Sequence, residues 1–159
     1  MVHKKGFTLI ELLVVISIIG LLSTLGAVSL NSARQRSRDA RRVADMKNLQ
    51  TALELYFDVN SVYPVEASAV SLAVTANKNI LCSSSASFAG SCAGGNTYMT
   101  LTTPAAPGCS DAVSVANVAE NYSYISADGS TYTVTFCLET GVGAFASAGD
   151  RTLTPAGIQ

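Results

Sequence analysis

The sequence predicts an α+β protein in which a long N-terminal helix packs against a small antiparallel β-sheet. Three observations predict this fold. An uncharged, mostly apolar run occupies residues 12–33, and an apolar stripe with helical spacing follows it over residues 43–57. Residues 121–138 then show the alternating aromatic and β-branched pattern of a β-hairpin. The length of 159 residues suits one compact domain with an appendage.

The charges are divided unevenly along the chain. Residues 1–50 carry eight Lys or Arg and three acids, which gives 8 − 3 = +5, whereas residues 51–159 carry two and eight, which gives 2 − 8 = −6. The total of −1 provides no overall field that favours nucleic acid. With one His and four Cys, and without a recognisable catalytic motif, we expect neither a metal-centred site nor an enzyme.

The uncharged run of 33 − 12 + 1 = 22 residues is long enough to cross a bilayer, which takes about 20. Three interpretations compete for it. A cleaved secretory signal has a shorter apolar region, of about 7–15 residues, so this interpretation is disfavoured. A plain membrane anchor is the second interpretation, and the third depends on residues 3–11.

Residues 3–11 combine features that make physical sense together. Lys4 and Lys5 hold a short leader at the cytoplasmic face. Gly6 has no side chain, so a protease can close around the backbone there. Glu11 is costly inside a membrane helix and needs a partner, which an ammonium group newly exposed at Phe7 would provide, within the chain or on another copy. The alternative is a Glu11 carboxylate solvated at headgroup depth.

The stretch K-K-G-F-T-L-I-E-L-L-V-V, from Lys4 to Val15, resembles the class III signal of type IV pilins and type II secretion pseudopilins. The resemblance is close over residues 4–30 and looser to Pro64. It implies a pilin-like fold and cleavage between Gly6 and Phe7 by a prepilin peptidase, which also N-methylates Phe7. It also implies that Glu11 neutralises the N-terminus of an adjacent subunit during assembly. Where many members have a proline in the span, this chain has Val28, so any local unwinding would rest on Gly26.

The resemblance further implies partners and a location. The partners are further copies and other pilins, the prepilin peptidase, an inner-membrane assembly platform and the lipid bilayer, and nucleic acid is not expected. The chain would cross the inner membrane once, with its head outside the cytoplasm, and would then enter an extracellular pilus or a periplasmic pseudopilus. The sequence does not decide between these two filaments. The alternative from another class is a monomeric, membrane-anchored binding protein.

We divide the chain into four parts: a leader (1–6), an assembly half of the helix (7–33), an amphipathic half (34–62) and a β-rich head (63–159). The helix is expected from about Thr8 to about Asn60, with Pro64 just beyond its end. Its apolar stripe comprises Val43, Met46, Leu49, Leu53, Tyr56 and Phe57. The opposite, solvated face is expected to carry Arg42, Asp45, Lys47, Asn48 and Glu54.

Five arginines follow the span: Arg34, Arg36, Arg38, Arg41 and Arg42. The positive-inside rule would place them in the cytoplasm, opposite to what the resemblance implies. We interpret them first as a solvated helix face. The functional alternative is contact with lipid headgroups or with the acidic heads of neighbouring subunits. Nucleic-acid binding is disfavoured because no aromatic residues alternate with the arginines.

In the head, residues 121–127 and 130–138 are expected to form a hairpin around Asp128-Gly129. One strand face is expected to pack on the helix stripe: Tyr132, Val134, Phe136 and Leu138. The other face carries Thr131, Thr133, Thr135 and Cys137. Residues 97–101 and 143–146 are further strand candidates, 70–74 is a candidate short helix, and the tail 153–159 is expected along the sheet edge.

The four cysteines all lie beyond the span, which indicates an oxidising compartment and two disulfides. Of the three possible connectivities we favour Cys82–Cys92 and Cys109–Cys137, with free thiols or a metal site as alternatives. No cofactor is expected. Asp128 and Asp150 are assigned to loops as turn residues, although they could ligate calcium, as in some pseudopilin heads.

Overall fold

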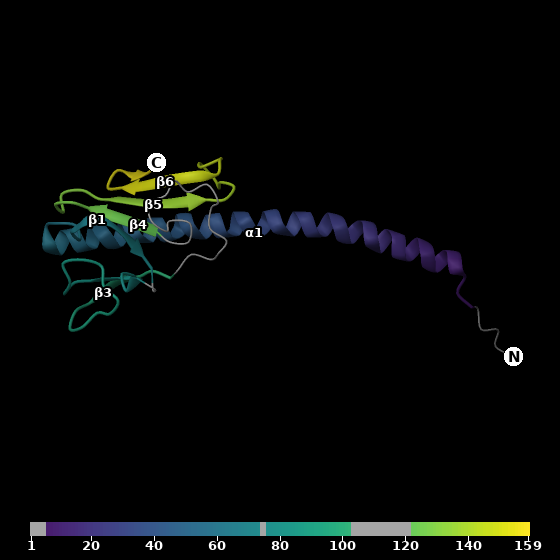
Figure 1. Ribbon diagram of the computed structural model, residues 1–159, viewed down its shortest axis with the longest axis horizontal. Helices are drawn as coiled ribbons and strands as arrows, with labels where there is room; N and C mark the ends of the chain where they lie inside the picture. The colour runs from purple at the N-terminus through teal and green to yellow at the C-terminus, as the bar shows by residue number, and fades with distance from the viewer. Residues whose placement is uncertain (1–5, 74–75, 103–121) are drawn as a thin grey trace. The chain divides into compact units, whose positions relative to one another are not determined.

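The computed structural model describes residues 6–73, 76–102 and 122–159. The chain divides into two compact units, residues 1–35 and 36–159. One helix, α1, runs from Leu9 to Asn60 and contributes to both (Figure 1). The helix begins one residue after the expected start at Thr8 and ends at the expected Asn60. Its end is marked by Ser61, whose positive φ of 60° does not continue a helix.

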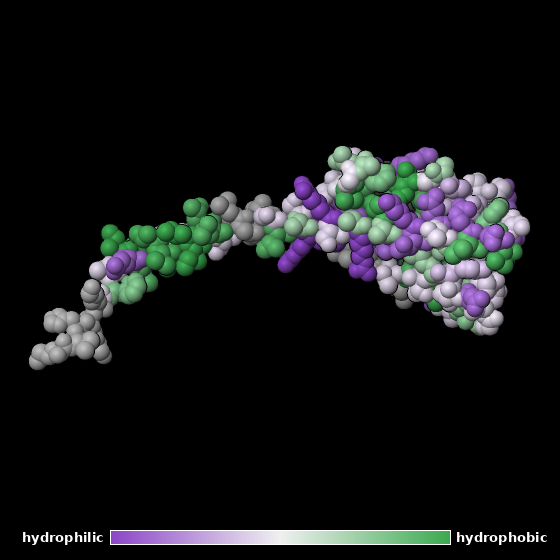
Figure 2. Space-filling model, turned by 180° about the vertical axis from the view of Figure 1, so that it is seen from behind, coloured by the Kyte–Doolittle hydropathy of each residue, from purple (hydrophilic) through white to green (hydrophobic). Residues whose placement is uncertain are grey.

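The first unit has no core of its own among its described residues. The large apolar side chains described there are half or more exposed, apart from Val14 and Val15 at 49% and 47%. Figure 2 shows an apolar surface along the visible side of this part of the helix. By length and composition, α1 is the one helix among the described residues that could cross a membrane.

The second unit is built around a five-stranded antiparallel sheet in the order β1-β4-β5-β6-β7. Its strands are β1 (Glu66–Leu72), β4 (Tyr122–Ser126), β5 (Thr133–Leu138), β6 (Gly149–Thr154) and β7 (Gly157–Ile158). A separate pair, β2 (Ile80–Cys82) and β3 (Thr97–Thr100), forms a two-stranded sheet. Both sheets contribute to one buried core with the second part of α1.

That core confirms the predicted match between the helix stripe and one face of the hairpin. On α1, Met46, Leu49 and Leu53 are completely buried. From the hairpin, the four predicted inward side chains are at most 1% exposed: Tyr132, Val134, Phe136 and Leu138. The stripe is less buried at its two ends, where Val43 is only partly buried and Phe57 is 37% exposed.

The hairpin is confirmed, but its turn is longer than the expected Asp128-Gly129 turn. Tyr124 pairs with Val134 and Ile125 with Thr133, so residues 127–132 connect the strands. Gly129 has a φ of +77°, and a Cβ there would approach the backbone oxygen of Tyr63 within 3.1 Å. The Tyr63 N–H donates to the Gly129 carbonyl at 2.8 Å. The longer loop therefore docks on the chain that leaves α1.

Two of the expected secondary-structure elements were wrong. Residues 70–72 of the expected short helix belong to strand β1, because Val70 pairs with Tyr124 across the sheet. Residues 143–146 form a tight turn closed by a bridge between Val142 and Phe145 rather than a strand. The tail does follow the sheet edge, where β7 pairs with β6.

The disulfide between Cys82 and Cys92 is confirmed, with 5.7 Å between their Cα atoms. It closes the loop that follows β2 in the smaller sheet. The other expected pairing, Cys109 with Cys137, stays a prediction because Cys109 lies outside the described residues. Cys137 itself lies in β5 and is 5% exposed.

Candidate functional site

The expected cleavage point lies just before α1, in a segment without helical structure. Gly6, Phe7 and Thr8 are exposed, and the Phe7 side chain is 85% exposed. A Cβ placed on Gly6 would meet no atom within 4 Å. The Gly6–Phe7 peptide bond is therefore sterically open to a protease, whereas a bond inside a helix would first have to be unwound.

Thr8 and Glu11 together cap the start of α1. The Thr8 backbone N–H donates to Oε2 of Glu11 at 2.8 Å, and the Thr8 hydroxyl donates to the same oxygen at 2.5 Å. In return, the Glu11 N–H donates to Oγ1 of Thr8 at 3.4 Å. This is a capping box, in which a Thr and a Glu three residues later satisfy each other's free N–H groups.

The capping role of Thr8 was missed in the sequence, although the T-x-x-E spacing before an apolar run signals it. The structure thus gives the Glu11 carboxylate two donors within the uncut chain. It does not test whether Glu11 pairs with an ammonium group at Phe7, in the same chain or in another copy.

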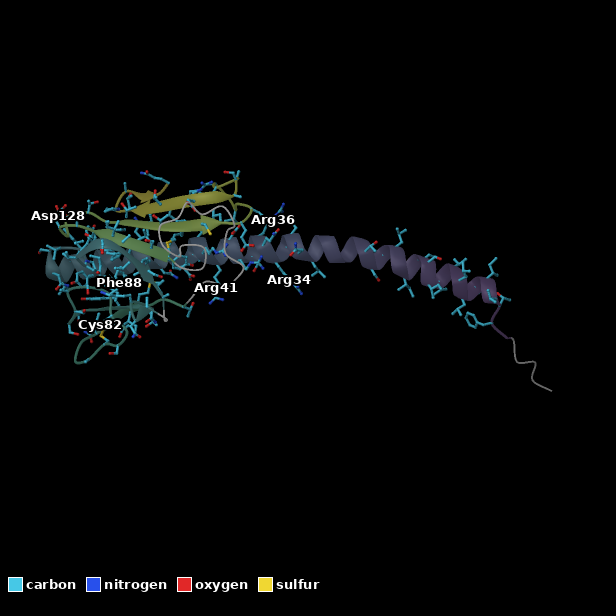
Figure 3. The ribbon with its side chains drawn as sticks, viewed as in Figure 1. Arg34, Arg36, Arg41, Cys82, Phe88 and Asp128 are labelled. Atoms are coloured by element: carbon cyan, nitrogen blue, oxygen red, sulfur yellow. A yellow bond between two sulfur atoms is a disulfide. The ribbon has the colours of Figure 1, made fainter. Side chains whose placement is uncertain are left out.

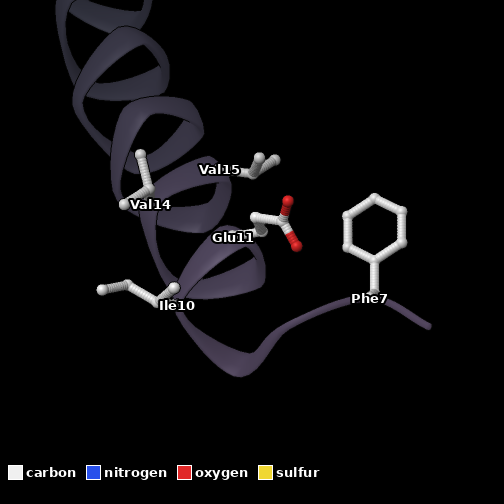
Figure 4. Close-up of a pocket in the computed structure, with 5 residues that line it drawn as sticks. All are labelled: Phe7, Ile10, Glu11, Val14 and Val15. Atoms are coloured by element: carbon white, nitrogen blue, oxygen red, sulfur yellow. The ribbon is translucent and has the colours of Figure 1, made fainter. Parts of the chain in front are cut away.

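Phe7 and Glu11 also border a shared hollow of about 390 Å³, together with Ile10, Val14 and Val15 (Figure 4). The carboxylate is the only charged group among these five side chains. An apolar surface surrounding one acid suits a partner that brings apolar groups and a single positive charge.

Further along the first unit, two polar side chains of the span bond to their own helix. The Ser17 hydroxyl donates to the carbonyl of Leu13 at 2.8 Å, and the Thr24 hydroxyl donates to that of Leu21 at 2.8 Å. Hydroxyls bonded back to their own helix do not need water, so they are compatible with a lipid or protein environment.

The interpretation of all five arginines as a solvated face is wrong for Arg38 and Arg42. Both bind Glu139, just after β5: Nε of Arg38 donates to its Oε1 at 2.8 Å, and Nη1 of Arg42 lies 2.9 Å from the same atom. Arg42 is only 4% exposed, so it does not belong to the solvated face expected for it. The guanidinium of Arg38, through its hydrogen bonds, lowers the pKa of Glu139.

Asp39 lies between these arginines and is completely buried. Its carboxylate accepts hydrogen bonds from the backbone N–H groups of Glu139, Thr140 and Gly141 at 2.8–3.0 Å, and it pairs with Arg42 at 3.0 Å. Burial raises the pKa of Asp39, but the hydrogen bonds together outweigh burial and lower it. This cluster of Arg38, Asp39, Arg42 and Glu139, the helix–head lock, fixes α1 to the head within the second unit.

The two candidate calcium ligands lie on different elements. Asp128 is in the hairpin loop, where its Oδ1 accepts from the backbone and hydroxyl of Ser130 at 2.9 and 2.7 Å. Asp150 was expected in a loop, but it lies in β6 opposite Cys137. Among the residues that the structure describes, no three His, Cys, Asp or Glu side chains gather as a metal site would require.

Comparison with known proteins supports the assignment of the N-terminal segment. Residues 1–27 match the family described as the prokaryotic N-terminal methylation motif. They contain the Gly6–Phe7 junction, Glu11 and most of the apolar run. This N-terminal segment therefore carries the methylation motif that the resemblance to type IV pilins and pseudopilins implies.

The proteins that this pilin-like chain resembles belong to type II secretion systems and to a type IV pilus. It is 33% identical to the type II secretion system core protein G of Vibrio cholerae over 76 residues, which are 48% of this chain and 52% of that one. The corresponding protein of Pectobacterium carotovorum is 36% identical over 62 residues, 39% and 40% of the two chains. The type IV wide pilus major component PilA4 of Thermus thermophilus is 39% identical over 71 residues, 44% and 54%.

The similarity is therefore confined to part of each protein. The pilin-like chain spans about half the length of the curated relatives that it matches. No solved structure matches it. The α+β architecture, with one long apolar N-terminal helix and an antiparallel sheet, nevertheless agrees with the fold that the family resemblance implies.

Proposed function

We propose that this chain is the precursor of a structural subunit of a type IV pilus or pilus-like filament. A prepilin peptidase cuts between Gly6 and Phe7 and methylates the new N-terminus at Phe7, while Lys4 and Lys5 hold the leader at the cytoplasmic face. The observation that carries this proposal is the motif match over residues 1–27. The exposed, non-helical Gly6–Phe7 junction supports it.

The exposed apolar side chains of the first unit support polymerisation. Among them, Ile10, Leu21 and Leu22 are 62–69% exposed on a helix that offers them no partner within the described unit. Contiguous apolar surface of this kind needs lipid or protein to cover it. Lipid covers it while the subunit is stored in the membrane, and the helices of other copies cover it in the filament.

Glu11 would set the register of neighbouring copies. Its carboxylate already attracts donors at the start of α1. After cleavage, an ammonium group replaces the Gly6–Phe7 amide, and in an apolar environment a charge-assisted hydrogen bond to this group is stronger than a neutral one. If the ammonium group belongs to another copy, the contact repeats from subunit to subunit without closing, which produces an open fibre.

The same geometry also supports a subunit of a type II secretion pseudopilus, and the similarity to core protein G favours this second candidate. In both cases the head lies outside the cytoplasm and the precursor spans the inner membrane once. An inner-membrane platform and other pilins are the partners that assembly would need.

The intact mass of the natural protein tests the processing step. We expect loss of Met1–Gly6 and the addition of one methyl group. A Gly6→Leu variant is the control: a Cβ at this exposed position has no atom within 4 Å beyond its chain neighbours, so the larger side chain should block the peptidase without disturbing the fold. A wild-type protein that retains its first six residues would contradict the proposal and favour a monomeric membrane-anchored protein.

Variants of Glu11 and Thr8 separate the two roles of Glu11, charge pairing and helix capping. Glu11→Gln keeps an oxygen that can accept from Thr8 but removes the charge, whereas Thr8→Val removes the hydroxyl and keeps the charge. If charge pairing sets the register, Glu11→Gln should still insert into membranes but should form few filaments, and Thr8→Val should assemble. Normal filament yield from Glu11→Gln, measured by shearing and immunoblotting, would show that pairing is not required.

A further inference from the structure

The structure separates the arginines after the span into two kinds. Arg38 and Arg42 are held by Glu139 in the helix–head lock. Arg34, Arg36 and Arg41 are exposed, and the last two belong to the second unit. Within the part of the chain that the structure describes, Arg36 has no ion pair or hydrogen bond, and Arg41 has only a long contact of 3.3 Å from its Nη2 to Oγ1 of Thr102.

The nearest acidic residues along the helix, Asp39 and Asp45, have other partners. Asp39 is buried and binds backbone N–H groups of the head. Asp45 accepts from the hydroxyl of Tyr122 at 2.9 Å. Neither carboxylate forms an ion pair with Arg36 or Arg41, so within the described residues both guanidinium groups remain available to an anion.

The sequence fixes how far Arg36 can lie from the end of the span. The uncharged run ends at Ala33, three residues earlier. Three residues of chain reach at most about 10 Å even when fully extended. The headgroup layer beyond the hydrocarbon core is several ångströms thick on each side, so Arg36 lies within or next to that layer whatever the placement of the second unit. Arg41 lies about 7.5 Å further along the helix.

The directions of the two side chains favour contact with a layer of lipid headgroups over contact with one face of a protein. They are five residues apart, so they leave the helix about 140° from each other. Figure 3 shows Arg36 and Arg41 on different sides of α1. Headgroups surround a helix that emerges from a bilayer and can reach both sides, whereas one docked protein would contact only one.

We propose that Arg36 and Arg41 bind the phosphate groups of anionic phospholipids at the membrane surface. The planar guanidinium group of arginine matches two phosphate oxygens at once. The proposal rests on the proposed function only in that residues 12–33 span a membrane. It adds a lipid preference, and it means that a subunit leaving the membrane for a filament must break these contacts.

The full, unprocessed chain in neutral detergent micelles provides the test. It is mixed with short-chain phosphatidylglycerol or phosphatidylcholine, and bound lipid is counted by native mass spectrometry. One arginine near an anionic surface changes binding by about fivefold at low salt, so the double variant R36Q/R41Q should lose about 25-fold in phosphatidylglycerol affinity. Phosphatidylcholine binding should change little.

Lys47→Gln is the matched control. Lys47 is also exposed and lies on the same helix, but it is 11 residues, about 16 Å, beyond Arg36. It should keep the lipid preference. A separate Arg34→Gln variant measures how much the preceding arginine contributes to phosphatidylglycerol affinity. Circular dichroism and an intact Cys82–Cys92 disulfide establish that each variant is folded.

Three results would overturn the proposal: a wild type that binds both lipids equally, a folded R36Q/R41Q variant that keeps its preference, or a Lys47→Gln variant that loses as much. If R36Q/R41Q kept the lipid preference but lost filament contacts, the arginines would instead bind neighbouring subunits. Because the lipid measurements use the chain before cleavage and assembly, none of the three overturning results depends on processing at Gly6.

Discussion

The two units of this chain differ in where their apolar side chains go. In the first unit, Ile16, Leu21 and Leu22 are 59–64% exposed. In the second, Met46, Leu49 and Leu53, on the same helix, are completely buried against the head. One secondary structure thus serves two purposes. The first unit's apolar residues are suited to contacts beyond the chain, and the second unit's are suited to its own folding.

Polar groups show the same contrast. Glu11 sits at an exposed helix start with Thr8 as its partner, whereas Asp39 is buried and held by three backbone N–H groups and an arginine. Substitutions in the second unit should therefore lower stability. Substitutions in the first should leave stability nearly unchanged and alter membrane or filament behaviour.

Removing Asp39 should have the largest effect. Asp39→Ala leaves three N–H groups and Arg42 without their buried acceptor, which should lower the free energy of unfolding of the second unit by about 3–5 kcal/mol. Thermal unfolding of the detergent-solubilised chain, followed by circular dichroism, measures this loss. Asp58→Ala, at an exposed position, is the control and should stay within about 0.5 kcal/mol of wild type. Equal stability of the two variants would show that the lock contributes nothing.

A matched pair of leucines compares the two units directly. Leu53→Ala creates a cavity in the buried core and should lower the free energy of unfolding of the second unit by about 2–5 kcal/mol. Leu22→Ala, at a side chain that is 62% exposed, should leave this unfolding transition unchanged. Unfolding in urea gives both values. A similar loss for Leu22→Ala would mean that the first unit packs on the second, contrary to the comparison.

Acid should act on the second unit through the helix–head lock. The pKa values of Asp39 and Glu139 are lowered from ordinary values of 3.8 and 4.5 in the folded chain. Since the unfolded chain then binds protons more readily, stability is fully present above about pH 5 and falls as the pH drops through 4. The melting temperature at pH 7, 5, 4 and 3 measures this fall.

The control for the acid experiment is Glu139→Gln. It should be less stable at pH 7, because the ion pairs with Arg38 and Arg42 are lost, but its melting temperature should depend less on pH between 5 and 3. A variant with the same acid dependence as wild type would locate the proton uptake elsewhere.

The sequence predicted most of what depends on local pattern. The helix follows from the apolar periodicity, and the inward face of β5 follows from alternation, as at Val134 and Phe136. The Gly6–Phe7 junction and Glu11 could be selected because each breaks a local pattern with a chemical purpose. The cap at Thr8 also depends on a local pattern, because a Thr and a Glu three residues later can bond to each other's N–H groups.

What the sequence did not reveal depends on contacts between distant residues. Arg42 looks solvated on a helical wheel, but Glu139, 97 positions later, draws it into the interior. Residues 70–72 contain Val70 and Leu72, a pattern compatible with helix or strand, and only pairing with β4 selects the strand. The longer hairpin loop likewise exists because Gly129 must reach Tyr63.

The smallest expected effect concerns the cap of the first unit. Thr8→Val removes a hydroxyl that both donates to and accepts from Glu11, so the first turn of α1 should fray. Amide hydrogen exchange should become faster at residues 9–12 and stay unchanged in the head, because the contacts that bury the second unit lie elsewhere. Thr51→Val is the control, since the Thr51 hydroxyl bonds only to the carbonyl of Lys47 in mid-helix and caps nothing. If exchange in the head also accelerated in Thr8→Val, the start of α1 would be coupled to the core, and the division into an outward-directed first unit and a self-contained second unit would be wrong.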